Sequence, residues 1–440
     1  MFDPKNIDLR ILRKRAYNLR WANVPGDVIP LTAADPDFPC APPIAEALTR
    51  FVNERYFCYG SPDGSPEFRE SMAAYYRTRR QIPASPDLIF PVDSAAFGIY
   101  LTCQAFLQPG DEAIIFDPVD FLFRYAIEAV SAVAVTFPIP SGTGSSTSTI
   151  SPDGSANPAT ASANPAIASA NPTTAGANPA TGRTNPATAS PNPAPPLDVA
   201  RLERLIYPKT RMICLCNPLN PTGKVFTRDE LREIGRIAVR HNLIILSDEI
   251  WSDIVFTPHV YTSIASLEEN IRTRTITITG FSKSYGLAGL RIGSVMTPNK
   301  KLYDRLMDAS RHQSTVHGAN ILAQVAATAA LNECGGWLQD FLQHLHAMRD
   351  LTVRRLNEIP GFSCIAPEGC YVAFADITGT GKTSTEIQEL LFDKAKVAVV
   401  PGRKEWFGPG AEGHIRLCFA TSEEILTTAL ERINKTITRL

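Results

Sequence analysis

Short apolar stretches alternate with amphipathic stretches along the first part of the chain, and this alternation predicts the fold. Apolar runs at residues 88–92, 112–116 and 132–138 fit buried strands, and the segments 94–107 and 121–130 between them fit helices. Strands that alternate with helices in this way predict a largely parallel sheet with helices on both faces.

The same pattern resumes later in the chain. It predicts strands at residues 211–216, 243–246 and 275–279, and a helix at 227–240 for which Thr227 is a good N-cap. In a parallel sheet, ligands bind beyond the carboxyl ends of the strands. The residues that follow these three strands are therefore candidates for a site.

Outside this alternation the pattern is more varied. A short strand is expected at residues 31–38, a strand pair at 363–365 and 371–375, and a further strand at 414–420. The expected organisation has three parts: an N-terminal arm with part of a small domain (1–50), a large domain (51–300) and a small C-terminal α+β domain (301–440). The predicted class is α/β, with a three-layer αβα large domain.

Residues 141–196 interrupt the large domain. The dipeptide Asn-Pro recurs there every seven residues, from position 157 to position 192, in a background of Ala, Ser and Thr. Proline removes backbone donors, and this segment has almost nothing apolar to bury. We therefore expect a low-complexity, disordered insertion that holds no catalytic residue.

Composition narrows the class of protein. The chain has 440 residues, 44% hydrophobic and 20% charged, with a net charge of −1, which argues against a generic surface for nucleic acid or anionic membrane. No run of about 18 apolar residues exists, so no membrane span is expected. The nine cysteines form no Cys-x-x-Cys pair, and with no export signal they predict reduced thiols and a cytoplasmic location.

One stretch, residues 279–293, concentrates candidate chemistry. It holds Lys283 between small and hydroxylated residues, and Arg291 eight positions further on. A lysine in a part-apolar turn can lose its proton and form a Schiff base with a carbonyl, and an arginine can bind a phosphate through two hydrogen bonds. A solvated loop lysine and a surface ion pair explain this stretch equally well when it is taken alone.

Three separated motifs together resemble the class I/II aminotransferase superfamily, the fold type I enzymes that use pyridoxal 5′-phosphate (PLP). They are Phe281-Ser-Lys283 with Arg291-Ile-Gly, the turn Asn217-Pro-Leu-Asn-Pro-Thr-Gly223, and Ser247-Asp-Glu-Ile. The resemblance spans nearly the whole chain apart from the insertion. It implies that PLP is the cofactor, with no metal, and that the substrates are small amino acids and oxo acids.

The resemblance also implies a role for each matching residue. Lys283 would hold PLP and move protons at the substrate α carbon, Asp248 would pair with the pyridinium nitrogen, and Asn220 would hydrogen-bond the phenolic oxygen. The residues implied to bind the phosphate are Arg291, Ser282 and the backbone amides of Ala95 and Ala96, which open a helix.

Two further matches concern the substrate. Arg416, inside an otherwise apolar strand, matches the family's arginine for the substrate α-carboxylate, and Asn220 is implied to bind the substrate as well. Tyr59 matches a tyrosine that reaches into the neighbouring subunit's site. The resemblance therefore implies a homodimer with active sites at the interface.

The chain departs from the family pattern at three cofactor positions, one of which is Gly280, where a serine or threonine often helps to bind the phosphate. Asp120 stands where an aromatic ring usually stacks on PLP, so either the adjacent Phe121 takes that role or the stacking partner is lost. Trp251 stands where many members carry tyrosine, which changes the hydrogen bond available to the cofactor oxygen.

The sequence leaves the reaction open after α-proton abstraction. Transamination is the family default, and C–S β-elimination that releases a thiol, pyruvate and ammonia is the alternative. The segments 34–38 and 248–250 resemble the cystathionine β-lyase-like branch, which is similar to fungal enzymes of secondary metabolism. A non-catalytic regulatory module is the third possibility, although no basic N-terminal DNA-binding module is evident.

Overall fold

The computed structural model describes residues 2–139 and 197–439. The insertion predicted at residues 141–196 lies outside these residues. Of the helices in the described ranges, none combines the length and the apolar composition that a bilayer span requires.

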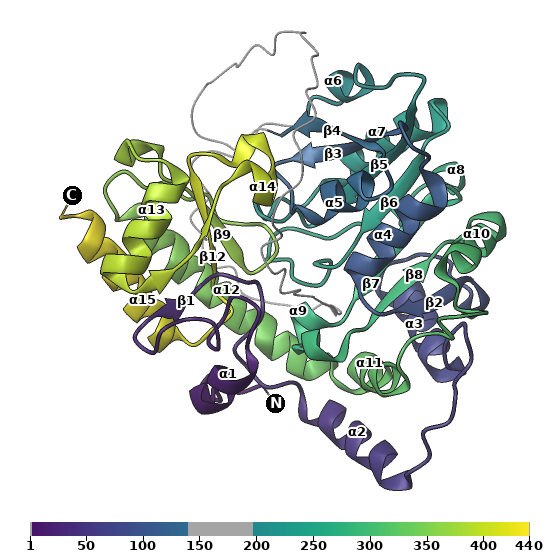
Figure 1. Ribbon diagram of the computed structural model, residues 1–440, viewed down its shortest axis with the longest axis horizontal. Coiled ribbons are helices and arrows are strands. Elements are labelled where there is room, and N and C mark those ends of the chain that lie inside the picture. The colour runs from purple at the N-terminus through teal and green to yellow at the C-terminus, as the bar shows by residue number, and fades with distance from the viewer. Residues whose placement is uncertain (1, 140–196, 440) are drawn as a thin grey trace.

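A seven-stranded sheet lies at the centre of the larger part of the fold (Figure 1). From one edge to the other, its strands are β2 (Ile89–Val92), β8 (Gly293–Met296), β7 (Thr275–Gly280), β6 (Ile244–Asp248), β5 (Thr210–Cys216), β3 (Glu112–Asp117) and β4 (Val133–Pro138). The strands from β7 to β4 run parallel, whereas β8 is antiparallel to both β7 and β2. The predicted α/β class with a mostly parallel sheet is confirmed.

The middle strands of this sheet are buried nearly end to end. Every residue of β7 is buried, as are all but one in each of β5 and β6. Their sequences are correspondingly rich in Ile, Leu and Thr, as expected for parallel strands that are covered on both faces.

Helices surround this sheet, and in Figure 1 they are coloured from blue to green. They are α3 (Pro66–Arg79), α4 (Ala95–Phe106), α5 (Leu122–Glu128), α6 (Val199–Glu203), α7 (Arg228–Arg240), α8 (Glu269–Arg272) and α10 (Lys300–Ser310). Helix α7 begins as predicted, because Thr227 and Glu230 form a capping box. Its inner face buries Leu231 and Ile234.

A second, antiparallel sheet lies in the C-terminal part of the chain, with β12 (His414–Cys418) between β11 (Val400–Pro401) and β9 (Val372–Asp376). The helices of this part are α11 (Ile321–Glu333), α12 (Gly335–Asn357), α13 (Ser384–Leu390), the π-helix η5 (Leu391–Ala395), α14 (Lys404–Phe407) and α15 (Glu423–Ile437). The predicted strand at 363–365 is wrong, because Ser363 forms only an isolated bridge to Asp376.

The N-terminal segment crosses between the two parts. After α1 (Leu9–Arg15), strand β1 (Ile29–Pro30) pairs in parallel with β10 (Val397–Ala398), and α2 (Pro42–Glu54) then contacts α11. The predicted strand at 31–38 is wrong. This segment turns instead, with Asp35 N donating to the Ala33 carbonyl at 2.9 Å, and Pro36 offers no N–H to a ladder.

One glycine fixes how closely β8 approaches the start of α4. A Cβ built on Gly293 would lie 2.8 Å from Ala95 N and 2.9 Å from the Thr279 carbonyl oxygen. Both are backbone atoms, so neither can be displaced unless helix α4 or strand β7 moves as a whole. Gly293 therefore allows β7, β8 and α4 to meet at one point.

We expect Gly293→Ala to lower the free energy of unfolding by about 1–3 kcal/mol, the usual cost of overpacking. Urea denaturation measures this change. Gly289→Ala is the matched control, because nothing lies within 4 Å of a Cβ at that position. Equal stability of the two variants would contradict the close approach.

Candidate active site

Three candidate residues follow the carboxyl ends of three adjacent parallel strands. Asn220 lies in the turn after β5, Asp248 is the last residue of β6, and Lys283 lies just after β7, in the short helix α9 (Ser282–Tyr285). Because the carboxyl ends of parallel strands meet at one edge of a sheet, these side chains come together there.

Lys283 is buried, with 6% of its surface exposed. Its Nζ donates a hydrogen bond to the Ala34 carbonyl at 2.8 Å and lies 5.1 Å from the centre of the Trp251 ring. Burial disfavours the charged amine and lowers the pKa of Lys283 to about 8, although the carboxylates of Asp35 and Asp120 act in the opposite direction. A substantial fraction of the amine is therefore neutral at mildly alkaline pH.

Asp248 is equally buried, at 5% exposure. Its Oδ1 accepts a hydrogen bond from Ile250 N at 3.1 Å, and within the described ranges no Lys, Arg or His side chain forms an ion pair with it. Burial raises the pKa of Asp248 to about 7, and the nearby carboxylates of Asp120 and Glu249 add to the rise. The charge of Lys283 opposes this rise but does not cancel it, so the site holds a buried carboxyl group whose ionisation is unfavourable.

Arg416, on β12, reaches this edge from the second sheet. Its Nη1 donates to Asn220 Oδ1 at 3.1 Å and its Nη2 donates to the Thr32 carbonyl at 3.1 Å. Its buried Nε has no hydrogen-bond partner among the residues that the structure describes. Asp120 completes the group, because its Oδ2 accepts from Asn220 Nδ2 at 2.8 Å and lies 4.0 Å from Arg416 Nη1. Burial raises the pKa of Asp120, an effect that Arg416 opposes.

The start of α4 offers backbone donors at the same edge. Ser94 caps the helix by accepting from Phe97 N at 3.0 Å, and the amides of Ala95 and Ala96 lie in the first turn. Arg291 is half-buried, which lowers its pKa, and Asp93 opposes that effect. Gly293 brings the start of α4 beside β7, the strand that leads into Ser282, a buried residue.

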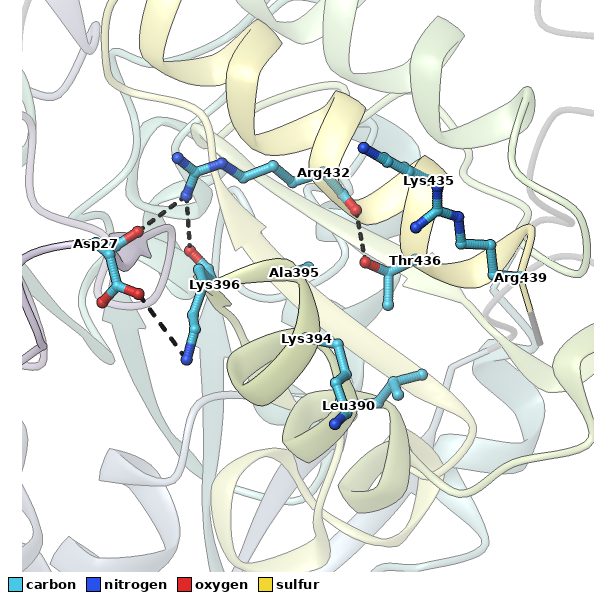
Figure 2. A pocket seen from close by; sticks show the side chains of 9 residues that line it. All are labelled: Asp27, Leu390, Lys394, Ala395, Lys396, Arg432, Lys435, Thr436 and Arg439. Carbon is cyan, nitrogen blue, oxygen red and sulfur yellow. Dashed lines mark hydrogen bonds and ion pairs between the residues drawn. The ribbon is translucent and has the colours of Figure 1, made fainter.

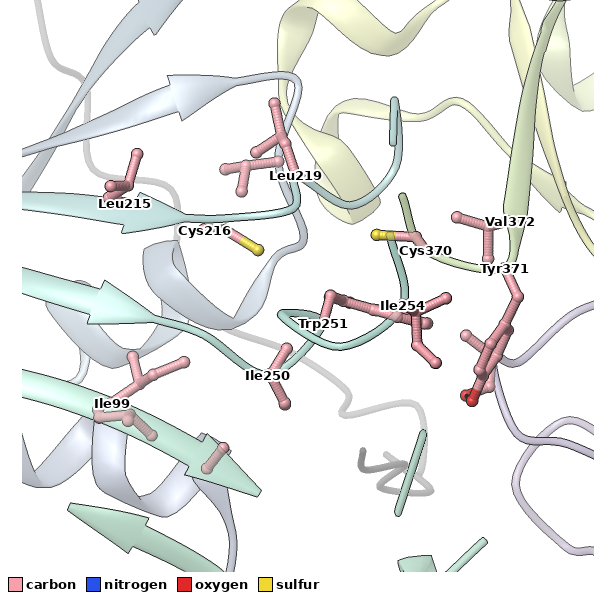
Figure 3. Close-up of a cluster of buried hydrophobic side chains, with 14 of the residues drawn as sticks. Ile99, Leu215, Cys216, Leu219, Ile250, Trp251, Ile254, Cys370, Tyr371 and Val372 are labelled. Carbon is pink, nitrogen blue, oxygen red and sulfur yellow. Dashed lines mark hydrogen bonds between the residues drawn. The ribbon is translucent and has the colours of Figure 1, made fainter. Parts of the chain in front are cut away.

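Two aromatic candidates have definite neighbours. Trp251 packs edge-on against Tyr371, with ring centres 4.7 Å apart, and these two residues lie with Cys216 and Cys370 in one buried cluster (Figure 3). Phe121 is half-buried and lies edge-on to Trp406 of α14 at 5.5 Å. Through this contact, Phe121 connects the part of the site beside the seven-stranded sheet to the C-terminal part of the chain.

Tyr59 stands apart from the other candidates. It is 90% exposed, and its ring lies edge-on to His317 at 4.8 Å. The structure of one chain does not bring Tyr59 to Lys283.

The structure adds residues that sequence reasoning did not assign to the site. Ala34 accepts hydrogen bonds from Lys283 Nζ and, at 3.1 Å, from the Tyr371 hydroxyl. The Thr32 carbonyl holds Arg416, and Asp35 acts on the charge of Lys283. The acidic Pro turn at residues 31–38 was the sequence feature that could have indicated these site residues. Nothing in its pattern, however, indicated which side chains it contacts.

A separate surface pocket lies between η5 and α15 (Figure 2). Its basic rim includes Lys394, Lys435 and Arg439, and Lys396 Nζ lies 3.9 Å from Asp27 Oδ2. It contains none of the candidate site residues.

Comparison with known proteins identifies the class of this chain. The sequence model of the family described as aminotransferase class I and II matches residues 26–142 and 176–433. The putative aminotransferase YugH of Bacillus subtilis is 32% identical, over 93% of this chain and 91% of that protein. The cystathionine beta-lyase PatB of the same organism is 25% identical, over 97% and 98%.

A solved structure agrees in fold. The aromatic aminotransferase from Pyrococcus horikoshii OT3 superposes with a TM-score of 0.77 at 27% identity, over 94% of this chain and 97% of that one. The chain therefore belongs to the aminotransferase class I and II family. It is a PLP-dependent aminotransferase, as the sequence motifs predicted.

The residues present fit PLP. Within the described ranges the buried Asp248 carboxyl group forms no ion pair and suits a protonated ring nitrogen, and the low pKa of Lys283 suits an amine that reacts with an aldehyde. The amides at the start of α4, together with Arg291, suit a phosphate. The unpartnered Nε of Arg416 suits a carboxylate.

The raised pKa of Asp248 predicts a pH-dependent stability of the protein without PLP. Its folded pKa of about 7 exceeds the ordinary value of 3.8, so ionisation costs stability as the pH rises from about 4 to about 7. Asp248→Asn removes this cost. We expect the variant to be more stable than the wild type. This gain in the free energy of unfolding should be about 2 kcal/mol larger at pH 8 than at pH 5.

Urea denaturation of PLP-free protein at the two pH values measures this difference. Asp308→Asn, at an exposed position on α10, serves as the control and leaves the pH dependence unchanged. A stability difference between Asp248→Asn and the wild type that does not vary with pH would show that Asp248 ionises as in water.

Proposed function

We propose that this aminotransferase moves the amino group of an amino acid to a 2-oxo acid, with Lys283 as the base at the substrate α carbon. The observation that carries this proposal is the buried Lys283 amine, with its pKa of about 8, whose charge interacts with those of Asp248 and Arg416. A neutral amine can take a proton from carbon, whereas an ammonium cannot.

When bound, PLP supplies an aldehyde for the amino group and an electron-poor ring that stabilises negative charge at the α carbon. Asp248 would hold the ring nitrogen, and Asn220 would reach the ring oxygen. Arg416 can only donate hydrogen bonds, so it fixes the orientation of the Asn220 amide, with Oδ1 facing Arg416. Of the two N–H groups on Nδ2, one bonds Asp120 and the other can donate to the ring oxygen. The groups that would hold the phosphate are Ser282, Arg291 and the amides of Ala95 and Ala96.

Arg416 would bind the substrate's α-carboxylate. Its guanidinium is held from two sides, by Asn220 Oδ1 and by the Thr32 carbonyl, so its orientation is set before a substrate arrives. The free Nε provides a further donor for a carboxylate. Trp251 lies against the Lys283 amine and helps to exclude water from it, and Phe121 is the candidate aromatic neighbour of the ring.

The exposed loop around Tyr59 supports a homodimer. Tyr56, Phe57 and Tyr59 are 77%, 59% and 90% exposed, and a run of large exposed aromatic side chains typically marks an interface. We infer that Tyr59 enters the site of a second copy of the chain. A cytoplasmic location is supported by the thiols, of which seven of nine are buried and all are free.

β-Elimination at a C–S bond is the second candidate. It is supported by the similarity to PatB, which covers 97% of this chain. Abstraction of the α proton by Lys283 is common to both reactions, so the residues named above serve either one. The reactions differ in whether a group leaves from the β carbon.

The test uses purified protein with PLP, a cysteine S-conjugate, and the presence or absence of a 2-oxo acid. We expect a new amino acid that forms only with the oxo acid, and at least a ~1000-fold loss of this activity in Lys283→Ala. Lys209→Ala, at an exposed lysine, is the matched control. Pyruvate and ammonia without the oxo acid would establish the lyase instead, and full activity of Lys283→Ala would refute the role of Lys283.

A further inference from the structure

Asp120 is built into the site by three hydrogen bonds. Its Oδ2 accepts from Asn220 Nδ2 at 2.8 Å, its Oδ1 accepts from Leu122 N at 3.3 Å, and its own N–H donates to the Asn220 carbonyl at 3.1 Å. A side chain fixed at both carboxyl oxygens and at the backbone has one orientation. Asp120 is therefore a positioned group and not a mobile surface residue.

The hydrogen-bond pattern identifies Asp120 as a carboxylate acceptor. Arg416 can only donate, so the Asn220 side chain must present its oxygen to Arg416 and its NH₂ group to Asp120. Both carboxyl oxygens of Asp120 consequently accept N–H groups, as an ionised carboxylate does.

The Asp120 carboxylate lies beside Arg416, the residue proposed to bind the substrate's α-carboxylate. Its Oδ2 is 4.0 Å from Arg416 Nη1, and the Asp120 side chain keeps 20% of its surface exposed while that of Arg416 keeps 8%. Asp120 also favours the positive charge of Lys283 and opposes the negative charge of Asp248. A negative group with an open face thus lies close to both the arginine and the lysine.

We propose that Asp120 is a specificity-determining residue, which directs the site toward amino acids with neutral or cationic side chains and against dicarboxylic amino acids. The proposal rests on the proposed function, in which Arg416 binds the α-carboxylate and Lys283 acts at the α carbon. A substrate held by these two residues lies beside Asp120, because Asp120 Oδ2 is 4.0 Å from Arg416 Nη1. A second carboxylate there meets a like charge, whereas an amide or ammonium donates to it.

The size of the effect follows from Coulomb's law. Two unit charges about 6 Å apart, in the intermediate dielectric of a protein surface, change a binding constant by roughly 10-fold to 100-fold. Asp120 also partly neutralises the charge of Arg416, but this lowers the affinity of Arg416 for every carboxylate ligand alike. The informative quantity is therefore the ratio of affinities for two ligands that differ only in one charge.

Glutarate and its monoamide, glutaramate, form such a pair, and their binding needs no turnover. Titration calorimetry on the PLP-loaded protein measures both dissociation constants. We expect the wild type to prefer glutaramate at least 10-fold, and Asp120→Asn to lose at least a factor of 10 of that preference. Asp120→Glu retains the charge and most of the preference. Glu128→Gln, which removes an exposed carboxylate on α5, leaves the ratio unchanged.

Two results would overturn the specificity role while leaving amino transfer by Lys283 intact. One is an equal affinity of the wild type for the two ligands, and the other is a ratio of dissociation constants that Asp120→Asn does not alter. Failure of every variant to bind either ligand would overturn the carboxylate site at Arg416, and with it this inference. Loss of turnover in Lys283→Ala is measured separately, so the two proposals fail in distinguishable ways.

Discussion

The removal of Lys283 from water is the constraint on which the candidate site depends. A buried ammonium is unfavourable, and the two carboxylates that favour its charge, Asp35 and Asp120, compensate for this only in part. The same burial makes ionisation of Asp248 unfavourable. The same edge of the sheet therefore holds a weakly basic amine and a weakly acidic carboxyl group, which is the pairing that PLP chemistry uses.

Three strands and the segment at residues 31–38 create this burial together. Strands β6 and β7 deliver Asp248 and Lys283, the segment at 31–38 covers the lysine from the N-terminal side, and β12 brings Arg416 from the second sheet. One cluster of buried hydrophobic residues joins the two sheets. The site is consequently rigid where the strands end and depends on contacts between distant parts of the chain.

Much of the fold and the positions of several candidates could be predicted from the sequence. The buried runs at 211–216 and 275–279 are strands, and the motifs place Asn220, Asp248 and Lys283 at strand ends, because a periodic apolar pattern and turn residues are local signals. The roles of these residues stay predictions. The strand expected at 31–38 was wrong because a short local pattern does not reveal a chain that turns to cover the distant Lys283.

Long-range partners could not be predicted in the same way. The contact of Phe121 with Trp406 and the hydrogen bond from Lys283 to Ala34 join residues hundreds of positions apart, and no local pattern encodes them. Asp120 was recognised only as a departure from an expected aromatic ring. Its hydrogen bonds to Asn220 became visible only with the fold.

The most direct test of this account is the pKa of the Lys283 amine in protein without PLP. Limiting acetylation at a series of pH values, with the modified peptide quantified by mass spectrometry, gives the pH at which half of the amine is neutral. The account predicts a midpoint near 8 for Lys283. A midpoint near the ordinary lysine value of 10.5 would contradict the claim that burial prepares this amine for its chemistry.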